Sequence, residues 1–199
     1  MQFFLCLKTY LYGVKEEVDK AAKVISEGGV ILYPTDTIWG LGCDPTNDKA
    51  IEKICAIKKR DESKSFIVLV NSEFLLNKYV HTIPEICYDL MDMAENPLTI
   101  IYPKGVSVSK KILADDGSIA IRKTSHDFCN ALMQRTKSGI VSTSANISGQ
   151  PFPKQFQDID PQILKEVDYV VNLQHDQKAG TPSQILKIGL KGELKIIRK

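Results

Sequence analysis

The sequence has few cysteines, few histidines and no long apolar run, and each scarcity argues against a class of protein. The five cysteines are odd in number and show no CxxC spacing, which is typical of free thiols in a reducing cytoplasm rather than of a disulfide framework. None of the three histidines lies at ligand spacing from a cysteine or another histidine, so a protein-bound metal is not expected. No apolar run approaches the ~20 residues of a membrane-spanning helix, and the first residues lack the features of a signal peptide. We therefore expect a cytoplasmic protein without a membrane segment.

Common nucleotide and hydrolase motifs are also missing. The chain has no GxxxxGK[ST] phosphate loop, no GxGxxG turn and no GxSxG elbow. The net charge is only +2, so no strongly basic field requires a nucleic-acid partner, and any basic site must be local. With 43% hydrophobic and 25% charged residues over 199 positions, the composition is that of an ordinary globular protein.

Helical and strand patterns alternate from end to end, without a repeat or an obvious linker. This alternation predicts one α/β or α+β domain spanning residues 1–199. Helices are expected at 15–27, 48–59, 84–94 and 126–136. Strands are expected at 30–33, 66–70, 98–102, 119–122, 140–142, 169–173, 185–188 and 194–197.

The stretch PTDTIWGLG follows the first apolar strand and raises two interpretations. A strand-to-turn junction explains it, because Asp and Thr satisfy turn backbone and glycine permits positive φ. A ligand site explains it as well, because ligands of open α/β sheets bind beyond strand ends, and glycines let a ligand approach the backbone closely.

The stretch KKRDESKS gathers four cations, Lys58, Lys59, Arg60 and Lys64, after a capped helix. A solvated helix C-terminus accounts for such a run, since cations favour the helix dipole there. A polyphosphate clamp accounts for it too, since arginine makes bidentate contacts and lysine supplies a mobile point charge.

Two further stretches place polar groups at strand ends. In VSTSANISGQP, a loop composition is one explanation, but Ser142, Ser144 and Asn146 alternate and point to one side of an extended segment, as a phosphate or ribose site requires. In SIAIRK, Arg122 ends an apolar strand, where it is either merely exposed or placed to bind a carboxylate.

Taken in this order, these stretches resemble the YrdC-like family, the threonylcarbamoyl-AMP synthases of tRNA modification, in its single-domain form. The resemblance runs from about residue 15 to the end, and it is carried by YPTDTIWGLGCD, IKKR, NPLTIIYP, IAIRKTSH, STSANISGQP and TPSQILKI. It implies a twisted mixed sheet of about seven strands, with helices packed around a concave basic cavity. It also implies that the chain forms L-threonylcarbamoyladenylate and pyrophosphate from L-threonine, bicarbonate and ATP, for N6-threonylcarbamoyladenosine in tRNAs that read ANN codons.

The resemblance assigns roles to individual positions. Lys58 and Arg60 match the catalytic Lys-x-Arg motif. The ATP-binding positions implied are Lys58, Arg60, Lys64, Ser144, Asn146 and Arg198. The threonine-binding positions implied are Thr37, Ser118, Arg122, Ser142 and Ser183. Mg²⁺, bound mainly through the ATP phosphates, is the implied cofactor.

The implied partners are a downstream tRNA threonylcarbamoyl transferase and, by direct contact, tRNA or double-stranded RNA, with no membrane. Three departures from the family pattern stand out: Leu69 takes the place of a histidine that helps bind threonine, Lys64 that of an asparagine, and Phe152 that of a small polar residue. The Leu69 departure leaves open a paralogous nucleotide-using enzyme with another substrate, and the expected concave basic surface leaves open an RNA-binding module. If the synthase is correct, catalysis rests mainly on positioning and charge neutralisation.

Overall fold

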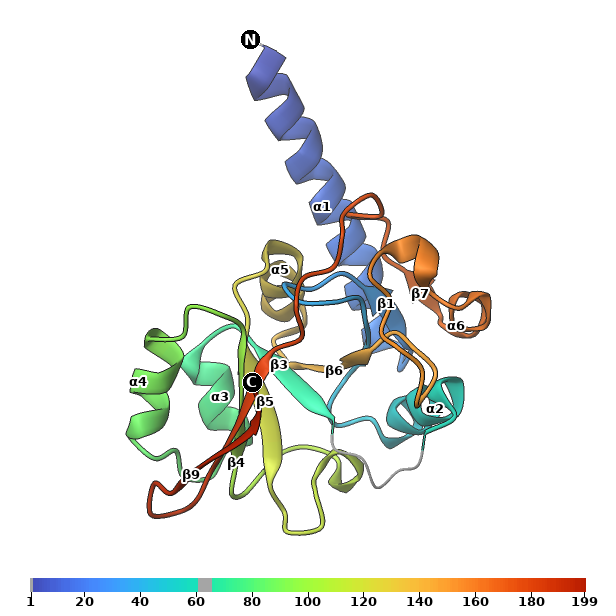
Figure 1. Ribbon diagram of the computed structural model, residues 1–199. Helices are drawn as coiled ribbons and strands as arrows, with labels where there is room; N and C mark the ends of the chain where they lie inside the picture. Colours follow the sequence, from blue (N-terminus) through green and yellow to red (C-terminus); the bar gives the residue numbers. More distant parts are fainter. Residues whose placement is uncertain (1, 61–65) are drawn as a thin grey trace.

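The computed structural model describes the backbone of residues 2–60 and 66–199, and the side chains of residues 13–60 and 66–199. Its described strands form one nine-stranded mixed sheet in the order β7-β1-β2-β6-β3-β5-β4-β8-β9 (Figure 1). The strands are β1 (Ile31–Tyr33), β2 (Gly40–Cys43), β3 (Ile67–Val70), β4 (Leu98–Tyr102), β5 (Ile119–Lys123), β6 (Ile140–Ser144), β7 (Tyr169–Val170), β8 (Gln184–Ile188) and β9 (Leu194–Arg198). The predicted mixed sheet is confirmed, with nine strands instead of about seven.

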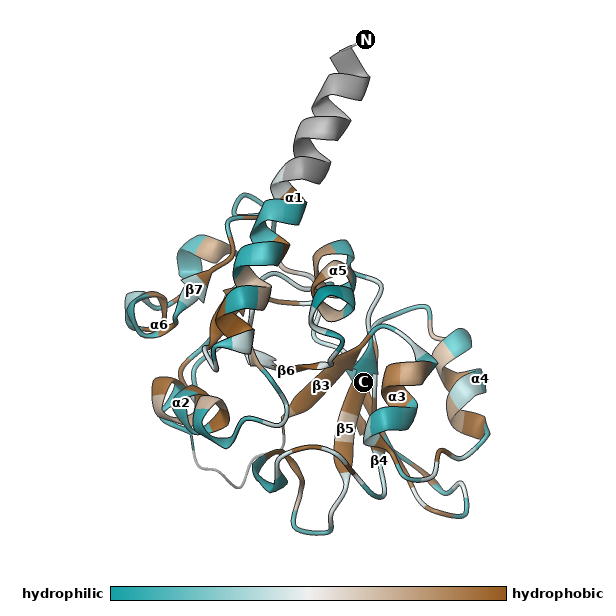
Figure 2. Ribbon diagram, turned by 180° about the vertical axis from the view of Figure 1, so that it is seen from behind, coloured by the Kyte–Doolittle hydropathy of each residue, from teal (hydrophilic) through white to brown (hydrophobic). Residues whose placement is uncertain are grey.

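The helices surround this sheet. They are α1 (Gln2–Ser26), α2 (Asp48–Lys58), α3 (Glu73–Tyr79), α4 (Ile86–Asp92), α5 (Asp127–Thr136) and α6 (Pro161–Glu166), with 3₁₀ turns at Lys110–Ile112 and Phe156–Asp158. Figure 2 shows the hydrophobic strands β3, β4 and β5 in the middle of the molecule, with the more hydrophilic helices around them. The described part of the chain contains no helix that is both long and apolar enough to cross a membrane.

Helix α2 illustrates how local sequence sets an element that later positions the site. The Asn47 side chain accepts a hydrogen bond from the Ala50 amide at 3.1 Å, which satisfies one of the amides left open at a helix start. Ile51 and Ile54 are fully buried on one helical face. Lys59 ends the helix in the left-handed conformation, at φ +49°, so the chain turns sharply there and Arg60 leaves the helix axis.

Helix α1 confirms the predicted buried face but begins at Gln2 rather than at residue 15. Val18, Ala21, Ala22 and Ile25 are all buried, as their spacing predicts. The residues before 15 are apolar with little polar interruption, so they show no 3.6-residue period from which the earlier start could be recognised. The short helices α3 and α6 were not predicted for a similar reason, since six or seven residues make fewer than two full turns of periodicity.

Strand β2 was not predicted, because the stretch PTDTIWGLG was interpreted as either a strand-to-turn junction or a ligand site. The segment pairs antiparallel with both β1 and β6, and Gly42 lies opposite Ile31 and Ser142. A Cβ atom on Gly42 would lie 2.6 Å from the Tyr33 ring and 2.8 Å from the Val141 carbonyl oxygen. This glycine therefore allows close packing of neighbouring strands, and only Gly40 lies where a ligand would approach the backbone.

A long connection crosses over the sheet from one edge towards the other. Residues 171–183 run from β7, at one edge, to β8, next to the other edge (Figure 1). On the way, the Gly180 amide donates to the Thr37 carbonyl oxygen at 2.5 Å, and the Ala179 amide donates to the Lys154 carbonyl oxygen at 2.7 Å. The connection thus lies against the PTDT segment and places Ser183 immediately before β8, beside Thr99 of β4.

Candidate functional site

A cavity of about 490 Å³ opens over the centre of the sheet, and most of the predicted site residues line it. Its floor consists of Ile67, Ala120, Ile101 and Ile185, from strands β3, β5, β4 and β8. Three arginines but no aspartate or glutamate occur among the described residues of the lining. The lining includes Thr37, Arg60, Arg122, Ser142, Ser144, Asn146, Ser183 and Arg198. The cavity is therefore positively charged and rich in hydroxyl groups, as an anionic ligand requires.

Arg122 is the most enclosed cation of the cavity, with only 4% of its surface exposed. Its Nη1 donates to Thr37 Oγ1 at 2.9 Å, and its Nη2 lies 3.0 Å from Asp36 Oδ1. Its Nε is buried and has no hydrogen-bond partner among the described residues. A buried donor without a partner is costly, so this edge of the guanidinium is suited to a ligand oxygen.

Arg122 and Arg198 lie on one line across the sheet. In the strand register, Arg122 of β5 is opposite Thr99 of β4, Thr99 is beside Ile185 of β8, and Ile185 is opposite Arg198 of β9. Thr99 Oγ1 lies 2.7 Å from Ser183 Oγ, and the guanidinium of Arg198 donates to the Ser183 carbonyl oxygen from Nε at 2.9 Å and from Nη2 at 2.6 Å. A pair of hydroxyls therefore separates two guanidinium groups.

Arg60 borders the cavity from the other side. Its Nη1 donates to Thr143 Oγ1 at 2.9 Å, and its guanidinium carbon lies 4.6 Å from the centre of the Phe66 ring. Burial lowers the pKa of Arg60, although arginine stays protonated at any physiological pH. These contacts hold a permanent cation on Thr143, the residue before Ser144, and Arg60, Ser144 and Asn146 all line the cavity.

Lys58 is not among the described residues that line the cavity, because its side chain is buried behind the Ser144–Asn146 loop. Its ammonium group donates to the carbonyl oxygens of Ser144 and Asn146, the second at 2.6 Å, and approaches Asn146 Oδ1 at 3.4 Å. Burial, and after it the positive charge of Arg60, lowers the pKa of Lys58 to about 7. Lys58 thus fixes the backbone of the loop, two residues along the chain from Arg60.

The alternation of Ser142, Ser144 and Asn146 has the expected consequence, since all three line the cavity. Ser142 and Ser144 project from β6 on one side, as period-2 spacing predicts. Asn146 continues the series just beyond the strand, where its Nδ2 donates to the Gln150 carbonyl oxygen at 2.6 Å.

Two further described positions named from the sequence, Ser118 and Leu69, are not part of the cavity lining, and a third, Lys64, is not described. Ser118 precedes β5 at the end opposite Arg122, and its hydroxyl and amide interact with Asp116. It is not among the described residues that line the cavity, so its binding role stays a prediction. Lys64 lies outside the described residues. Leu69 is fully buried in β3, opposite Arg122 in the register, so the position of the missing histidine is part of the apolar core.

Thr99 and Thr143 are two contributors that the sequence analysis did not single out. Thr99 is fully buried in the strand LTIIY, between apolar neighbours. A short hydroxyl side chain within an apolar strand is a signal that indicates a buried hydrogen bond. Thr143 carried no such signal, because it belongs to a stretch that is polar throughout.

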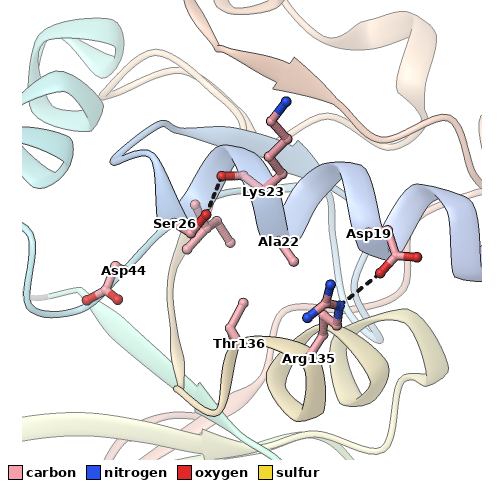
Figure 3. Close-up of a pocket in the computed structure, with 8 residues that line it drawn as sticks. Asp19, Ala22, Lys23, Ser26, Asp44, Arg135 and Thr136 are labelled. Atoms are coloured by element: carbon pink, nitrogen blue, oxygen red, sulfur yellow. Dashed lines mark hydrogen bonds and ion pairs between the residues drawn. The ribbon is translucent and has the colours of Figure 1, made fainter.

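A second cavity, of about 520 Å³, lies between α1 and α5, away from all of these residues. Figure 3 shows its side chains, among them Asp19, Lys23, Asp44 and Arg135. The Arg135 Nε donates to Asp19 Oδ1 at 2.9 Å, and both side chains are largely exposed. Charges of both signs and an exposed ion pair give this cavity no preference for a ligand of one charge.

Comparisons with known proteins find relatives that match most of the chain. The family model for Sua5, YciO and YrdC, described as telomere recombination, matches residues 23–199. The threonylcarbamoyl-AMP synthase of Xanthomonas euvesicatoria is 33% identical over 159 residues, covering 78% of this chain and 85% of the relative. That of Pseudoalteromonas translucida is 34% identical, covering 76% and 83%.

Solved structures share the fold. A double variant of P. abyssi Sua5 is 25% identical, with a TM-score of 0.79, and the match covers 87% of this chain and 53% of that protein. E. coli YciO, at 23% identity and a TM-score of 0.80, matches 93% of this chain and 89% of its own.

Proposed function

The chain belongs to the Sua5/YciO/YrdC family, and we propose that it is a threonylcarbamoyl-AMP synthase, a nucleotidyltransferase that uses L-threonine, bicarbonate and ATP. The observation that carries the proposal is the lining of the cavity, which has three arginines and several hydroxyl groups. Among the described residues, no carboxylate lines it. Each of the three substrates carries at least one negatively charged group. The carbamate formed from threonine and bicarbonate must then be brought against ATP for the reaction. The single nine-stranded sheet, with strands from Ile31 to Arg198, supports the prediction of one domain.

The proposed chemistry needs no nucleophile from the protein. The threonine ammonium group and bicarbonate condense into a carbamate, with formation of an N–C bond and release of one water and one proton. A carbamate oxygen then attacks the α-phosphorus of ATP, and the bond to the β-phosphate breaks with its electron pair leaving on pyrophosphate. Catalysis in such a transfer is positioning and neutralisation of charge.

The residues that line the cavity can be assigned to ATP or to threonine by their neighbours. Arg60, Ser144 and Asn146 share one side of the cavity, and we assign to them the triphosphate and ribose of ATP. Phe152 and Ile197, both part of the lining, offer apolar surface for the adenine ring. On the other side, Arg122 with its unpartnered Nε binds the threonine carboxylate, and Thr37 and Ser183 contact the remaining polar groups. One P. abyssi Sua5 structure contains L-threonine, which supports an amino-acid site in this fold.

Mg²⁺ is proposed only as a companion of ATP. No group of three or more His, Cys, Asp or Glu side chains that could hold a metal occurs in the described residues, and no carboxylate among them lines the cavity. The protein donors therefore do not fit a resident Mg²⁺ site, which needs oxygen ligands and carboxylates above all. The ion is expected on the phosphate oxygens, and none of the steps proposed here depends on it.

The product is a reactive mixed anhydride, so a second enzyme must take it up. We propose a tRNA threonylcarbamoyl transferase for this role, and a cytoplasmic location where tRNA and ATP meet. Direct contact with tRNA or double-stranded RNA would use the same basic cavity. A net charge of +2 argues against strong binding of this kind, because affinity for nucleic acid grows with the number of phosphates neutralised.

To test this function, the purified chain is incubated with ATP in the presence of Mg²⁺, with and without L-threonine and bicarbonate. The release of pyrophosphate and of AMP is measured. We expect release only when both are present. Serine and valine serve as matched amino acids, and serine should react about tenfold more slowly, since a methyl group is worth ~1–3 kcal/mol. Because Leu69 replaces the family histidine next to Arg122, release that prefers another amine would instead favour a paralogous enzyme.

Binding of ATP is expected to take up a proton, because of Lys58. In the free protein its pKa is lowered to about 7, so at pH 8 the group is mostly neutral. A bound triphosphate adds negative charge and raises this pKa, so protonation accompanies binding and the affinity for ATP falls as pH rises above 7. Isothermal titration calorimetry at pH 8, in buffers of different ionisation enthalpy, measures the proton directly. The uptake should vanish in Lys58→Met, and no uptake in the unaltered chain would contradict the prediction.

A further inference from the structure

The proposed reaction passes through an intermediate that carries two carboxylate groups. Before the carbamate forms, threonine presents one carboxylate to the protein. Once its nitrogen carries a second, the bound species is a dianion whose two charges are separated by only the nitrogen and the α-carbon. A site that holds this dianion needs two cations facing one space, because each buried charge must be paired.

Arg122 and Arg198 meet this requirement. Both line the same cavity, on one register line of the sheet, with the hydroxyls of Thr99 and Ser183 between them. The Arg122 charge is partly neutralised by Asp36, whereas no aspartate or glutamate of the described residues lies within ion-pair distance of Arg198. Burial lowers the pKa of Arg198, and the positive charge of Arg122 lowers it further, as expected for two like charges that line one cavity. An anion between them would offset both charges.

The donors that remain free on the guanidinium groups of Arg122 and Arg198 also favour an anion bound between them. Arg122 Nε is buried without a partner, and Arg198 uses only Nε and Nη2, both on Ser183, among the described residues. Each guanidinium therefore retains a donor for a ligand oxygen after its contacts within the protein are made. The backbone contact to Ser183 also holds Arg198 in place, although its strand β9 is exposed along its whole length.

We propose that Arg198 binds the carboxylate derived from bicarbonate, while Arg122 binds the carboxylate of threonine, so that the pair forms a subsite for the N-carboxythreonine dianion. This inference rests on the proposed function and adds a residue for its second substrate. It assigns Arg198 to the carbamate, whereas the resemblance alone places it near ATP. The two positions are adjacent, because the carbamate oxygen must reach the α-phosphorus.

The test compares the unaltered chain with Arg198→Gln, and with Lys195→Gln as a control that removes an exposed charge from the same strand. We expect Arg198→Gln to raise KM for bicarbonate at least tenfold, while the Kd for threonine alone and KM for ATP change less than twofold. Lys195→Gln should leave all three within twofold. A rise in KM for ATP alone would make Arg198 a phosphate ligand and overturn the proposal, and so would an equal weakening of all three substrates.

A second measurement separates this inference from the proposed function. The dianion 2-(1-hydroxyethyl)succinate, in which a methylene replaces the nitrogen of N-carboxythreonine, binds without ATP or turnover and is measured by calorimetry. We expect Arg198→Gln to weaken its binding at least tenfold. If the unaltered chain makes no threonylcarbamoyl-AMP but binds this dianion through Arg198, the proposed function fails and the subsite stands. If the chain turns over and both Arg198 effects are absent, the subsite fails and the function stands.

Discussion

Replacing Arg122 by glutamine is expected to lower kcat/KM for threonine by roughly 10²- to 10³-fold, because a buried, charge-assisted hydrogen bond from Nε to the threonine carboxylate is lost at a cost of about 2–5 kcal/mol. Arg122 is nearly enclosed, and its Nη1 and Nη2 are already committed to Thr37 and Asp36. The substitution therefore disturbs the PTDT segment as well as the substrate. Steady-state kinetics with threonine as the varied substrate measure the effect.

Two controls separate binding from folding. Lys123→Gln removes the neighbouring positive charge of β5, whose side chain is exposed, and should change kcat/KM less than threefold. Arg122→Lys keeps the charge, but a single ammonium group cannot contact Thr37, Asp36 and the substrate in the geometry of a planar guanidinium, so this variant should remain at least tenfold impaired. Thermal unfolding of each variant shows how much of the loss is structural. Full activity of a folded Arg122→Gln protein would remove Arg122 from the substrate site.

The second large effect is expected at Arg60. Arg60→Ala should lower kcat by roughly 10²- to 10³-fold, because a fixed donor to the developing charge on the phosphates is removed. The guanidinium group is held on Phe66 and Thr143, so it is positioned before ATP arrives. Pyrophosphate release at saturating threonine and bicarbonate measures kcat, and near-normal turnover would refute the role as a phosphate clamp.

Lys59→Gln provides the matched control for Arg60. Lys59 is the preceding residue, it is exposed, and it is not among the described residues that line the cavity. Its removal takes the same charge from the same chain segment and should change kcat less than threefold. If both substitutions were equally harmful, the effect would come from the general field of the basic run rather than from one placed guanidinium.

Much of the fold follows from local sequence, because its causes are local. Asn47 caps α2 through a contact three residues away, and the buried face of α1 follows from apolar residues three and four positions apart. Strands β4, β5 and β6 were predicted because short apolar runs between turn residues form buried strands. Strand β2 was not predicted, because its two glycines are needed for contact with Tyr33 and Val141, residues that the local sequence does not place beside it.

The sequence by itself named several of the residues that line the cavity: Thr37, Arg60, Arg122, Ser142, Ser144 and Asn146 came from strand ends, from alternation or from the family motifs. Only the tertiary structure decided how they act together. Lys58 stands next to Arg60 in the motif, yet its ammonium group lies behind the loop, because burial depends on what packs around a helix end. Arg122 and Arg198 are far apart in the chain and become partners through the pairing of β5, β4, β8 and β9. Such pairing is set by the packing of the whole sheet, and no local period of the sequence encodes it.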